Sequence, residues 1–455
     1  FRPSHFKHYY GMEIALGCDV ESMRVNQVMG SSTFWSGWQQ LPSPLAGGVG
    51  IIYVTLLLAC SDGGNSSGGG SGVSNSGPTG KLGTAMAYST NGLGLTQVVL
   101  ADLNGDGRKD IVTISDMSYG AMLAIYYQDK FGQFNTGPPI NGYVTYNFAS
   151  FGRISVGDLN NDGRADLVLT GQCIRCIGGY QFVVIYQDPV TGNLLPGQTF
   201  FGAGGSAAIA DINSDGRNDF ITNNASGTVS IFYQLQNGSL RAEFVYDKIT
   251  GFVRGEIHIG DMDNDGDNDI IVQSNIKQLA IIKQDSDIVP GILTDTPEYY
   301  DVQTTNWPMF DAFAVGDLNG DGKNDVVVLD PGNNGTMNVF LQNKNGKLDP
   351  PILTVPWFAP PYGVEIADIN GDELNDILGD QVNPGVPAMG NVYVLYQAPD
   401  HTFQSPIAYS FPTRSGGGSA EHERLAVGDV TGDGKPDAVM TWQDEGVFVL
   451  PNTSP

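Results

Sequence analysis

The chain has 455 residues, of which 61 are glycine, 25 are proline and only 16% are charged, a composition typical of an all-β protein with many turns. Asp and Glu number 49 against 22 Lys and Arg, and the formal charge of −27 excludes nucleic acid as a natural partner, because polyanions repel one another. The same charge predicts a self-repelling fold that bound cations would stabilise.

The N-terminal part of the chain differs from the rest. Residues 1–44 show no convincing periodicity and are left unassigned, residues 45–60 are mostly apolar, and residues 61–81 form a Gly/Ser-rich linker. The apolar run ends in Leu57-Leu58-Ala59-Cys60, which resembles a bacterial lipoprotein signal. We therefore expect an exported protein, at the cell surface or extracellular, that touches the membrane only through a lipid or anchor at its N-terminus, with lipidation at Cys60. The alternatives are a cleaved ordinary signal, an uncleaved anchor and a structural strand.

An acidic nonapeptide recurs in the remainder of the chain. It reads Asp-x-(Asn/Asp/Thr)-x-Asp-(Gly/Glu)-x-x-Asp, and successive copies begin 50 to 61 residues apart. This period is too long for a helical solenoid repeat and suits a four-stranded propeller blade. The copies begin at Asp102, Asp158, Asp211, Asp261, Asp317, Asp368 and Asp429. We predict an all-β fold in which residues 82–455 form a seven-bladed β-propeller of four-stranded antiparallel blades.

Each nonapeptide has the chemistry of a calcium loop. Oxygen side chains at positions 1, 3, 5 and 9, with the carbonyl at position 7, form a cage of hard donors, and Gly at position 6 permits a sharp turn. Crowded carboxylates repel one another, and a divalent cation relieves that cost. Magnesium is disfavoured because it keeps its waters. We therefore expect calcium, up to seven ions, as the cofactor.

The predicted ligands fall in seven loops of nine residues. They are Asp102, Asn104, Asp106, Arg108 and Asp110 in loop 1; Asp158, Asn160, Asp162, Arg164 and Asp166 in loop 2; Asp211, Asn213, Asp215, Arg217 and Asp219 in loop 3; Asp261, Asp263, Asp265, Asp267 and Asp269 in loop 4; Asp317, Asn319, Asp321, Lys323 and Asp325 in loop 5; Asp368, Asn370, Asp372, Leu374 and Asp376 in loop 6; and Asp429, Thr431, Asp433, Lys435 and Asp437 in loop 7. Loop 4 carries the most negative charge. Glu373 replaces the turn Gly in loop 6, and Thr431 is a weak ligand in loop 7, so these two loops are expected to be weak or empty sites.

The segments around the loops are predicted to form strands. Residues 98–101 and 111–114 flank loop 1 with apolar, largely β-branched side chains, so each loop is expected to join two antiparallel strands. In six units a later apolar strand ends in Gln, which we expect to hold a hairpin: Gln128, Gln187, Gln234, Gln284, Gln342 and Gln397. A turn and an outer strand complete each four-stranded meander.

The seventh unit lacks an outer strand of its own. After loop 7 only residues 438–442 and 447–450 read as strands, whereas residues 84–90, upstream of loop 1, look like the outer segment of the sixth unit at residues 406–410. We predict that residues 84–90 complete the last blade, so that an N-terminal strand closes the ring and covers an exposed edge.

These motifs resemble the FG-GAP and VCBS repeat families, which include the propeller at the head of integrin alpha chains and some fungal propeller lectins. The resemblance covers about residues 82–455. It implies an integrin-alpha-like, seven-bladed propeller with calcium between the first and second strands of each blade. It does not identify a ligand, because such propellers serve in adhesion, as lectins, as scaffolds and occasionally as enzymes.

Other reactive side chains are sparse. A local disulfide between Cys173 and Cys176 is plausible outside the cytoplasm, whereas a zinc half-site would need two further ligands. None of the five histidines lies in a recognisable hydrolase or metalloprotease motif, so we name no catalytic residue and expect no enzyme activity.

The expected function is therefore that of a non-enzymatic, calcium-binding propeller on a bacterial cell surface, with a protein or glycan partner that the sequence does not identify. Aromatic residues on the face opposite the loops, such as Phe201, Trp307 and Trp357, either bind this partner or pack between blades. One alternative is a structural subunit of an extracellular filament or surface layer, with possible self-assembly. Another is a propeller lectin or enzyme.

Overall fold

The computed structural model describes the chain from residue 81 onwards, with gaps. The described residues are 81–89, 95–117, 120–134, 145–146, 148–173, 179–223, 228–251, 253–274, 277–284, 292–303, 312–330, 336–354, 363–382, 389–412, 425–442 and 446–454. Contacts divide the chain into two units, Phe1–Val73 and Ser74–Pro455, and all described residues belong to the second. The predictions for residues 1–44, 45–60 and 61–80, including lipidation at Cys60, lie outside the described residues, as do Trp307 and Trp357.

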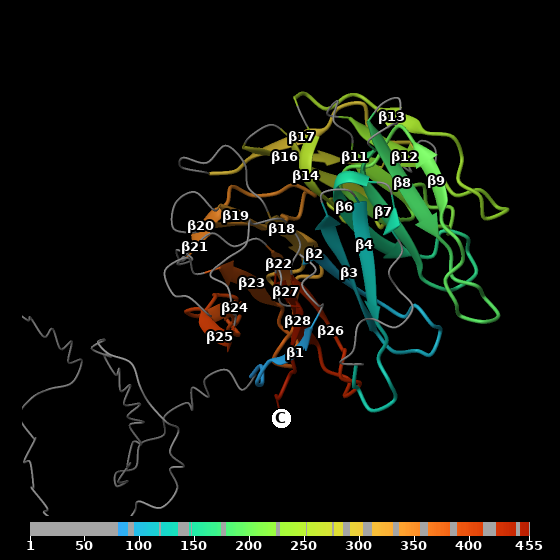
Figure 1. Ribbon diagram of the computed structural model, residues 1–455. Helices are drawn as coiled ribbons and strands as arrows, with labels where there is room; N and C mark the ends of the chain where they lie inside the picture. Colours follow the sequence, from blue (N-terminus) through green and yellow to red (C-terminus); the bar gives the residue numbers. More distant parts are fainter. Residues whose placement is uncertain are drawn as a thin grey trace, which may run out of the picture. The chain divides into compact units, whose positions relative to one another are not determined.

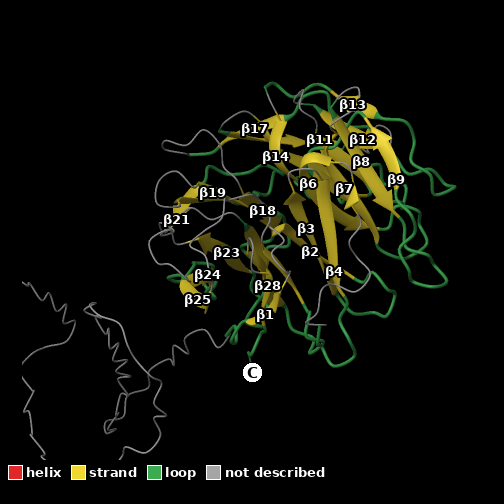
Figure 2. Ribbon diagram, in the orientation of Figure 1, coloured by secondary structure: helices red, strands yellow, loops and turns green. Residues whose placement is uncertain are grey.

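All regular structure in the described residues is β (Figure 2), and they contain no helix long and apolar enough to cross a membrane. The strands form seven antiparallel four-stranded sheets, which we number as blades 1 to 7. From the inner to the outer strand, blade 1 contains β2 (Leu95–Ala101), β3 (Asp110–Met117), β4 (Gly120–Tyr126) and β5 (Thr145–Tyr146); blade 2 contains β6 (Phe148–Gly157), β7 (Asp166–Cys173), β8 (Tyr180–Ile185) and β9 (Gln198–Phe201); blade 3 contains β10 (Ala207–Ala210), β11 (Asp219–Asn223), β12 (Val229–Phe232) and β13 (Phe244–Tyr246); blade 4 contains β14 (Val253–Gly260), β15 (Asp269–Ser274), β16 (Gln278–Ile282) and β17 (Glu298–Asp301); blade 5 contains β18 (Ala312–Gly316), β19 (Asp325–Asp330), β20 (Thr336–Phe340) and β21 (Ile352–Thr354); blade 6 contains β22 (Val364–Ala367), β23 (Asp376–Val382), β24 (Met389–Leu395) and β25 (Ile407–Pro412); and blade 7 contains β26 (Leu425–Gly428), β27 (Asp437–Trp442), β28 (Gly446–Leu450) and β1 (Met86–Ser89).

The blades close into a ring around an axis. The first strands contact one another in the order β2, β6, β10, β14, β18, β22, β26 and back to β2. Figure 1 shows β2, β18 and β22 near the centre of this unit and β9, β13, β21 and β25 at its rim. The predicted seven-bladed propeller is confirmed.

The core is divided among the interfaces between blades. Buried apolar side chains gather in seven clusters within the described residues, and each cluster draws its members from two neighbouring blades. Both faces of a blade are covered, so its middle strands are mostly apolar: β19 contains Val326, Val327 and Val328, all fully buried. Outer strands such as β9 are largely exposed, and Phe201 at its end is 62% exposed.

The prediction for ring closure is also confirmed. Strand β1 pairs antiparallel with β28, from Met86 opposite Val449 to Ser89 opposite Gly446. Tyr88 of β1 is buried, with its ring edge against the ring of Phe134 in blade 1 at a centroid distance of 5.5 Å. Strand β1, the first strand of the described residues, thereby completes the last blade and packs against blade 1.

Candidate metal centre

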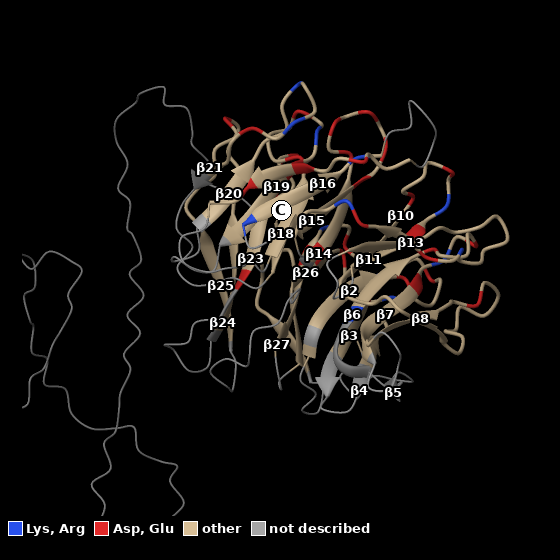
Figure 3. Cartoon of the chain, turned by 90° about the horizontal axis from the view of Figure 1, so that it is seen from above, with Lys and Arg blue, Asp and Glu red and all other residues tan. Residues whose placement is uncertain are grey.

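The seven acidic loops share one conformation, set by the Asp at position 1. One of its carboxylate oxygens accepts the backbone NH of position 5 at 3.1–3.3 Å, and the other accepts the NH of position 6 at 2.7–2.9 Å. The Asp at position 5 in turn accepts the NH of position 7. The loop backbone thus curls around the carboxylates of positions 1 and 5. Figure 3 shows that Asp and Glu lie mainly in loops, while the strands consist mostly of other residues.

The Asp at position 9 clamps the base of each loop. It is fully buried in all seven copies. Its Oδ2 accepts the backbone NH of position 2, and its Oδ1 accepts the NH of the Gln that follows the third strand, or of Asn452 in blade 7. In loop 7 Asp437 Oδ2 also accepts the NH of Thr431, whereas in the other six loops each oxygen accepts one backbone NH and keeps a second lone pair that a cation could use. Position 9 therefore joins the loop to the hairpin of the same blade.

Burial raises the pKa of this carboxyl group. The pKa is raised to about 6 for Asp110 and Asp325 and is also raised for Asp437. It is raised to about 7 for Asp166, Asp219, Asp269 and Asp376. Loss of solvation is the main cause, and the accepted backbone NH groups oppose it.

We expect the metal-free protein to lose stability as pH rises from about 4 to about 7. In the unfolded chain the carboxyl groups of the Asp residues at position 9 ionise with a pKa near 3.8. In the folded chain the same groups stay protonated up to about pH 7. The free energy of unfolding should level off above that range, and calcium, which favours the ionised form, should reduce the loss. Calorimetry between pH 4.5 and 8 with and without a chelator measures this. A melting temperature of the chelated protein that rises over the same range would contradict it.

Two positions of each loop adopt the left-handed backbone conformation. Position 6 was expected to do so, and its φ lies between 68° and 91°; position 4 does so as well, with φ between 53° and 77°. Glu373 at position 6 of loop 6 has a φ of 68°, which confirms the unfavourable backbone predicted for it. Gly, Asn or Ser stands at position 4 in every loop, a recurrence that sequence inspection could have identified.

Replacing Glu373 by Gly should raise the free energy of unfolding by about 0.5–1 kcal/mol, because the left-handed strain of about 1–2 kcal/mol exceeds the extra chain entropy of Gly. Gly322→Ala is the matched control. It changes the same position of loop 5, where φ is 80° and an added Cβ would meet no atom within 4 Å. This control should lose about 1 kcal/mol in urea unfolding. A Glu373→Gly variant less stable than the parent would show that the Glu side chain contributes more than the strain costs.

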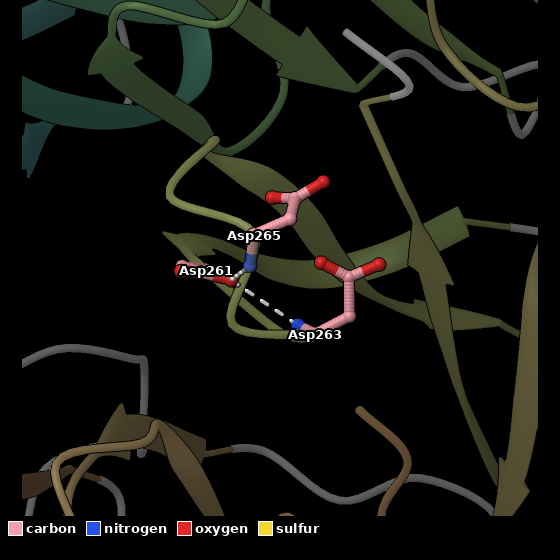
Figure 4. A group of neighbouring side chains, drawn as sticks. All are labelled: Asp261, Asp263 and Asp265. Atoms are coloured by element: carbon pink, nitrogen blue, oxygen red, sulfur yellow. Dashed lines mark hydrogen bonds between the residues drawn. The ribbon is translucent and has the colours of Figure 1, made fainter. Parts of the chain in front are cut away.

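Loop 4 gathers three carboxylates. One oxygen from each of Asp261, Asp263 and Asp265 lies within 4.8 Å of the others (Figure 4). Burial, together with repulsion from Asp263, Asp267 and Asp261, raises the pKa of Asp265. Asp269 is not part of this group, because it lies at the base of the loop with both oxygens accepting backbone NH groups. The structure therefore brings together positions 1, 3 and 5 of the predicted cage.

Several oxygen atoms at predicted ligand positions are buried without a hydrogen-bond partner among the described residues. They are Asp162 Oδ2 at position 5 and Asp263 Oδ1 at position 3; Asp267 Oδ2, on a side chain at position 7 whose carbonyl is the predicted ligand, also has no partner. A buried carboxylate oxygen without a partner is costly, and a cation supplies the missing contact. The donor set therefore fits a hard divalent ion.

Basic side chains occupy some of the remaining oxygens. Arg108 pairs with Asp106, Arg217 with Asp215, and Lys323 with Asp321, each from position 7 to position 5. In loop 2 the Arg at position 7 instead donates to a Gln, and the position 5 carboxylate keeps its unpaired oxygen. An ion in loops 1, 3 and 5 would have to displace these side chains.

Lys283 offsets part of the negative charge of loop 4. Its Nζ lies 3.3 Å from Asp263 Oδ2 and 3.2 Å from Glu298 Oε1, and it donates to the carbonyl of Gly346 at 2.9 Å. Burial lowers the pKa of Lys283, but the two carboxylates outweigh burial and raise it overall. The most acidic loop thus has an internal counterion that also links blades 4 and 5.

The loops are tied to one another around the ring. The Nε2 groups of Gln187, Gln234, Gln342 and Gln397, each in the hairpin of one blade, donate to a carbonyl in the loop of the preceding blade. Asn at position 8 makes an equivalent bond to the carbonyl of position 1 of the preceding loop in four places: Asn218, Asn268, Asn324 and Asn375. The Gln was correctly expected to hold a hairpin, where it forms a β-bridge, but its contact with the preceding blade was not foreseen.

The residue at position 2 links the loops to the core. It is apolar and buried in every loop, and its side chain packs into the cluster shared with the following blade: Leu103, Leu159, Ile212, Met262, Leu318, Ile369 and Val430. A change in loop conformation would therefore move a core side chain at a blade interface.

A closed ring of seven four-stranded sheets, with one acidic loop after each inner strand, defines a repeat-built β-propeller. The family model described as FG-GAP-like repeat matches residues 102–169, 211–272 and 317–379, and each match contains two of the loops. These FG-GAP-like repeats, together with the seven-bladed ring, support an integrin-alpha-like FG-GAP propeller, as the motifs predicted.

Comparison with solved structures supports the fold alone. The crystal structure of BBS1N in complex with ARL6DN, soaked with lead, contains a chain with 11% sequence identity and a TM-score of 0.50, covering 82% of this chain and 98% of that one. The mercury-soaked crystal of the same complex gives 12% identity and a TM-score of 0.49, covering 83% and 98%. Comparison with curated proteins gave no match.

The disulfide prediction lies outside the described residues. Cys173 ends β7, but its side chain is not described, and Cys176 lies in a segment that the structure does not describe. The pairing of Cys173 with Cys176 stays a prediction.

Proposed function

We propose that the chain is a calcium-stabilised, non-enzymatic binding propeller. The observation that carries this proposal is the set of buried, partnerless side-chain oxygens at positions 3 and 5, those of Asp263 and Asp162. Calcium would be held by the side chains of positions 1, 3 and 5, with position 9 fixing the loop from below. The loops contact the hairpin and the loop of neighbouring blades, so the ions would stabilise the ring as a platform for a partner.

Metal counting tests the calcium proposal. Equilibrium dialysis of the full chain against calcium at about 1 mM, a concentration suited to extracellular sites, should give several ions per chain, with loops 6 and 7 filling last. Asp158→Ala should remove one ion, whereas Asp247→Ala, at an exposed carboxylate outside the loops, should remove none. Fewer than one ion per chain would refute the proposal.

We propose further that the propeller is displayed on a bacterial cell surface and binds a protein or glycan. This rests on the lipoprotein-like segment ending at Cys60 and on the resemblance to adhesive and lectin propellers. Mass spectrometry of the native N-terminus tests the lipid anchor, because a lipidated N-terminal cysteine supports it and an intact residue 1 contradicts it. A glycan array with calcium and with chelator tests the glycan partner.

A further inference from the structure

A second polar cluster lies on the propeller axis, away from the acidic loops. Inner strands β2, β14, β22 and β26, from blades 1, 4, 6 and 7, enclose a cavity of about 260 Å³. Its lining includes Val99, Glu256, His258, Glu365 and Val427. Because blade 4 lies across the ring from blades 7 and 1, the cavity spans the axis.

A β-bulge points Glu256 towards this cavity. The pairing of β14 with β15 shifts register between Arg254 and Ile257, and Gly255 in the bulge has a φ of 71°. Asn223 of blade 3, itself buried, donates its Nδ2 to the carbonyl of Gly255 at 3.1 Å. Bulges of this kind redirect a side chain and are common beside binding sites. The position of Glu256 is thus fixed by contacts within and between blades.

The carboxylate of Glu256 needs a partner. The residue is only 5% exposed; its Oε2 lies 3.2 Å from His258 Nε2, and its Oε1 has no hydrogen-bond partner among the described residues. The ring of His258 rests on the ring of Phe313 at a centroid distance of 4.4 Å. Glu365, which has an interaction of its own, also lies in the lining, and the described lining residues include neither Lys nor Arg. This chemistry selects a cation.

The shape of the cavity selects an organic cation over a bare metal ion. Among the described residues, the one group of three acidic, His or Cys ligand atoms within 4.8 Å of one another is in loop 4, so Glu256, His258 and Glu365 do not form such a group. The cavity is several times the volume of one water, about 30 Å³. Its remaining walls are apolar, as at Val99, Val364 and Val427. We propose that the axial cavity binds a small protonated aliphatic amine, with the ammonium on Glu256 and the alkyl chain against these walls.

Titration of the full chain with n-butylammonium chloride, in saturating calcium to occupy the loops, tests the proposal. Calorimetry should show saturable binding of one amine per chain, and the NMR signals of the His258 ring should shift in step. The neutral isostere n-butanol should not bind. Glu256→Gln should weaken amine binding about tenfold or more, as expected for the loss of a charged hydrogen-bond partner. Asp247→Asn, which removes the same charge at an exposed site, should leave binding unchanged.

Protein stability separates a binding role from a structural one. Glu256→Gln keeps the size of the side chain and removes a buried charge whose Oε1 has no hydrogen-bond partner among the described residues, so its melting temperature should equal or exceed that of the parent. A lower melting temperature combined with unchanged amine binding would assign Glu256 a structural role and overturn the proposal. Absence of saturable binding, or saturable binding of zinc chloride in place of the amine, would overturn it as well.

Discussion

A chain that lacks residues 1–89 should lose its closed ring and at least about 3 kcal/mol of its free energy of unfolding. The deletion removes β1, its antiparallel pairing with β28 and the buried ring of Tyr88. Truncating a buried aromatic side chain alone costs about 3–5 kcal/mol. The newly exposed edge of β28, with Val447 and Phe448 in it, should also promote association between molecules. Urea unfolding followed by circular dichroism, with size-exclusion chromatography, measures both effects.

The matched control for this deletion begins at Lys81. It keeps β1 and the contacts that precede it, where Thr453 NH donates to the carbonyl of Lys81 at 2.8 Å and Leu82 forms a bridge with Asn452. It should be monomeric and should unfold at higher urea than the chain beginning at residue 90. If the two chains unfold alike, β1 does not close the ring in solution.

Asp261→Ala should destabilise the protein by about 3 kcal/mol even without metal. Its carboxylate accepts the backbone NH groups of Asp263, Asn264, Asp265 and Gly266. A hydrogen bond to a charged group contributes about 1.5–3 kcal/mol to stability, but bonds that share an acceptor are not additive. Losing all four should therefore cost more stability than losing one, but less than four times as much. In calcium the deficit should grow, because the variant also loses a ligand of loop 4. Calorimetry in chelator and in calcium separates the two contributions.

Asp247→Ala is the control for Asp261→Ala, because it also removes one negative charge but lies outside the loops. Asp247 is exposed and forms only a 3.4 Å surface ion pair with Lys248, so the variant should change the free energy of unfolding by no more than about 0.5 kcal/mol. If the Asp261→Ala variant is as stable as this control, the acidic loops do not stabilise the connections between the first and second strands of the blades.

The blade count, the ring closure and the strained turn could be predicted because the repeat, and each departure from it, is visible in a short stretch of sequence. The spacing of the acidic loops gave the blade count, the short seventh unit gave the closure by β1, and the missing Gly at position 6 gave the strained backbone of Glu373. In each case a short stretch of sequence determines the geometry.

Contacts between repeats were harder to predict. Gln187 meets the carbonyl of Asp102, 85 residues earlier, and no local pattern identifies that partner. Position 9 was predicted only as a metal ligand, because an acidic side chain in an acidic loop is typical of one. Its structural role, joining the loop to the hairpin, was missed because its burial depends on how the hairpin folds back. The axial pair of Glu256 and His258 depends on a bulge at Gly255, and register shifts of this kind occur in the inner strands of only some blades, so the repeat pattern does not predict them.

The central claim is that cations in the acidic loops stabilise the ring. Differential scanning calorimetry of the full chain in excess calcium, in EGTA, and in EGTA with magnesium tests it directly. Each site saturated at 100 times its dissociation constant adds about 2.7 kcal/mol to the free energy of unfolding, so removal of calcium should lower the melting temperature by many degrees. Excess calcium should restore the melting temperature, and magnesium should not. Identical melting curves in calcium and in EGTA would contradict the claim.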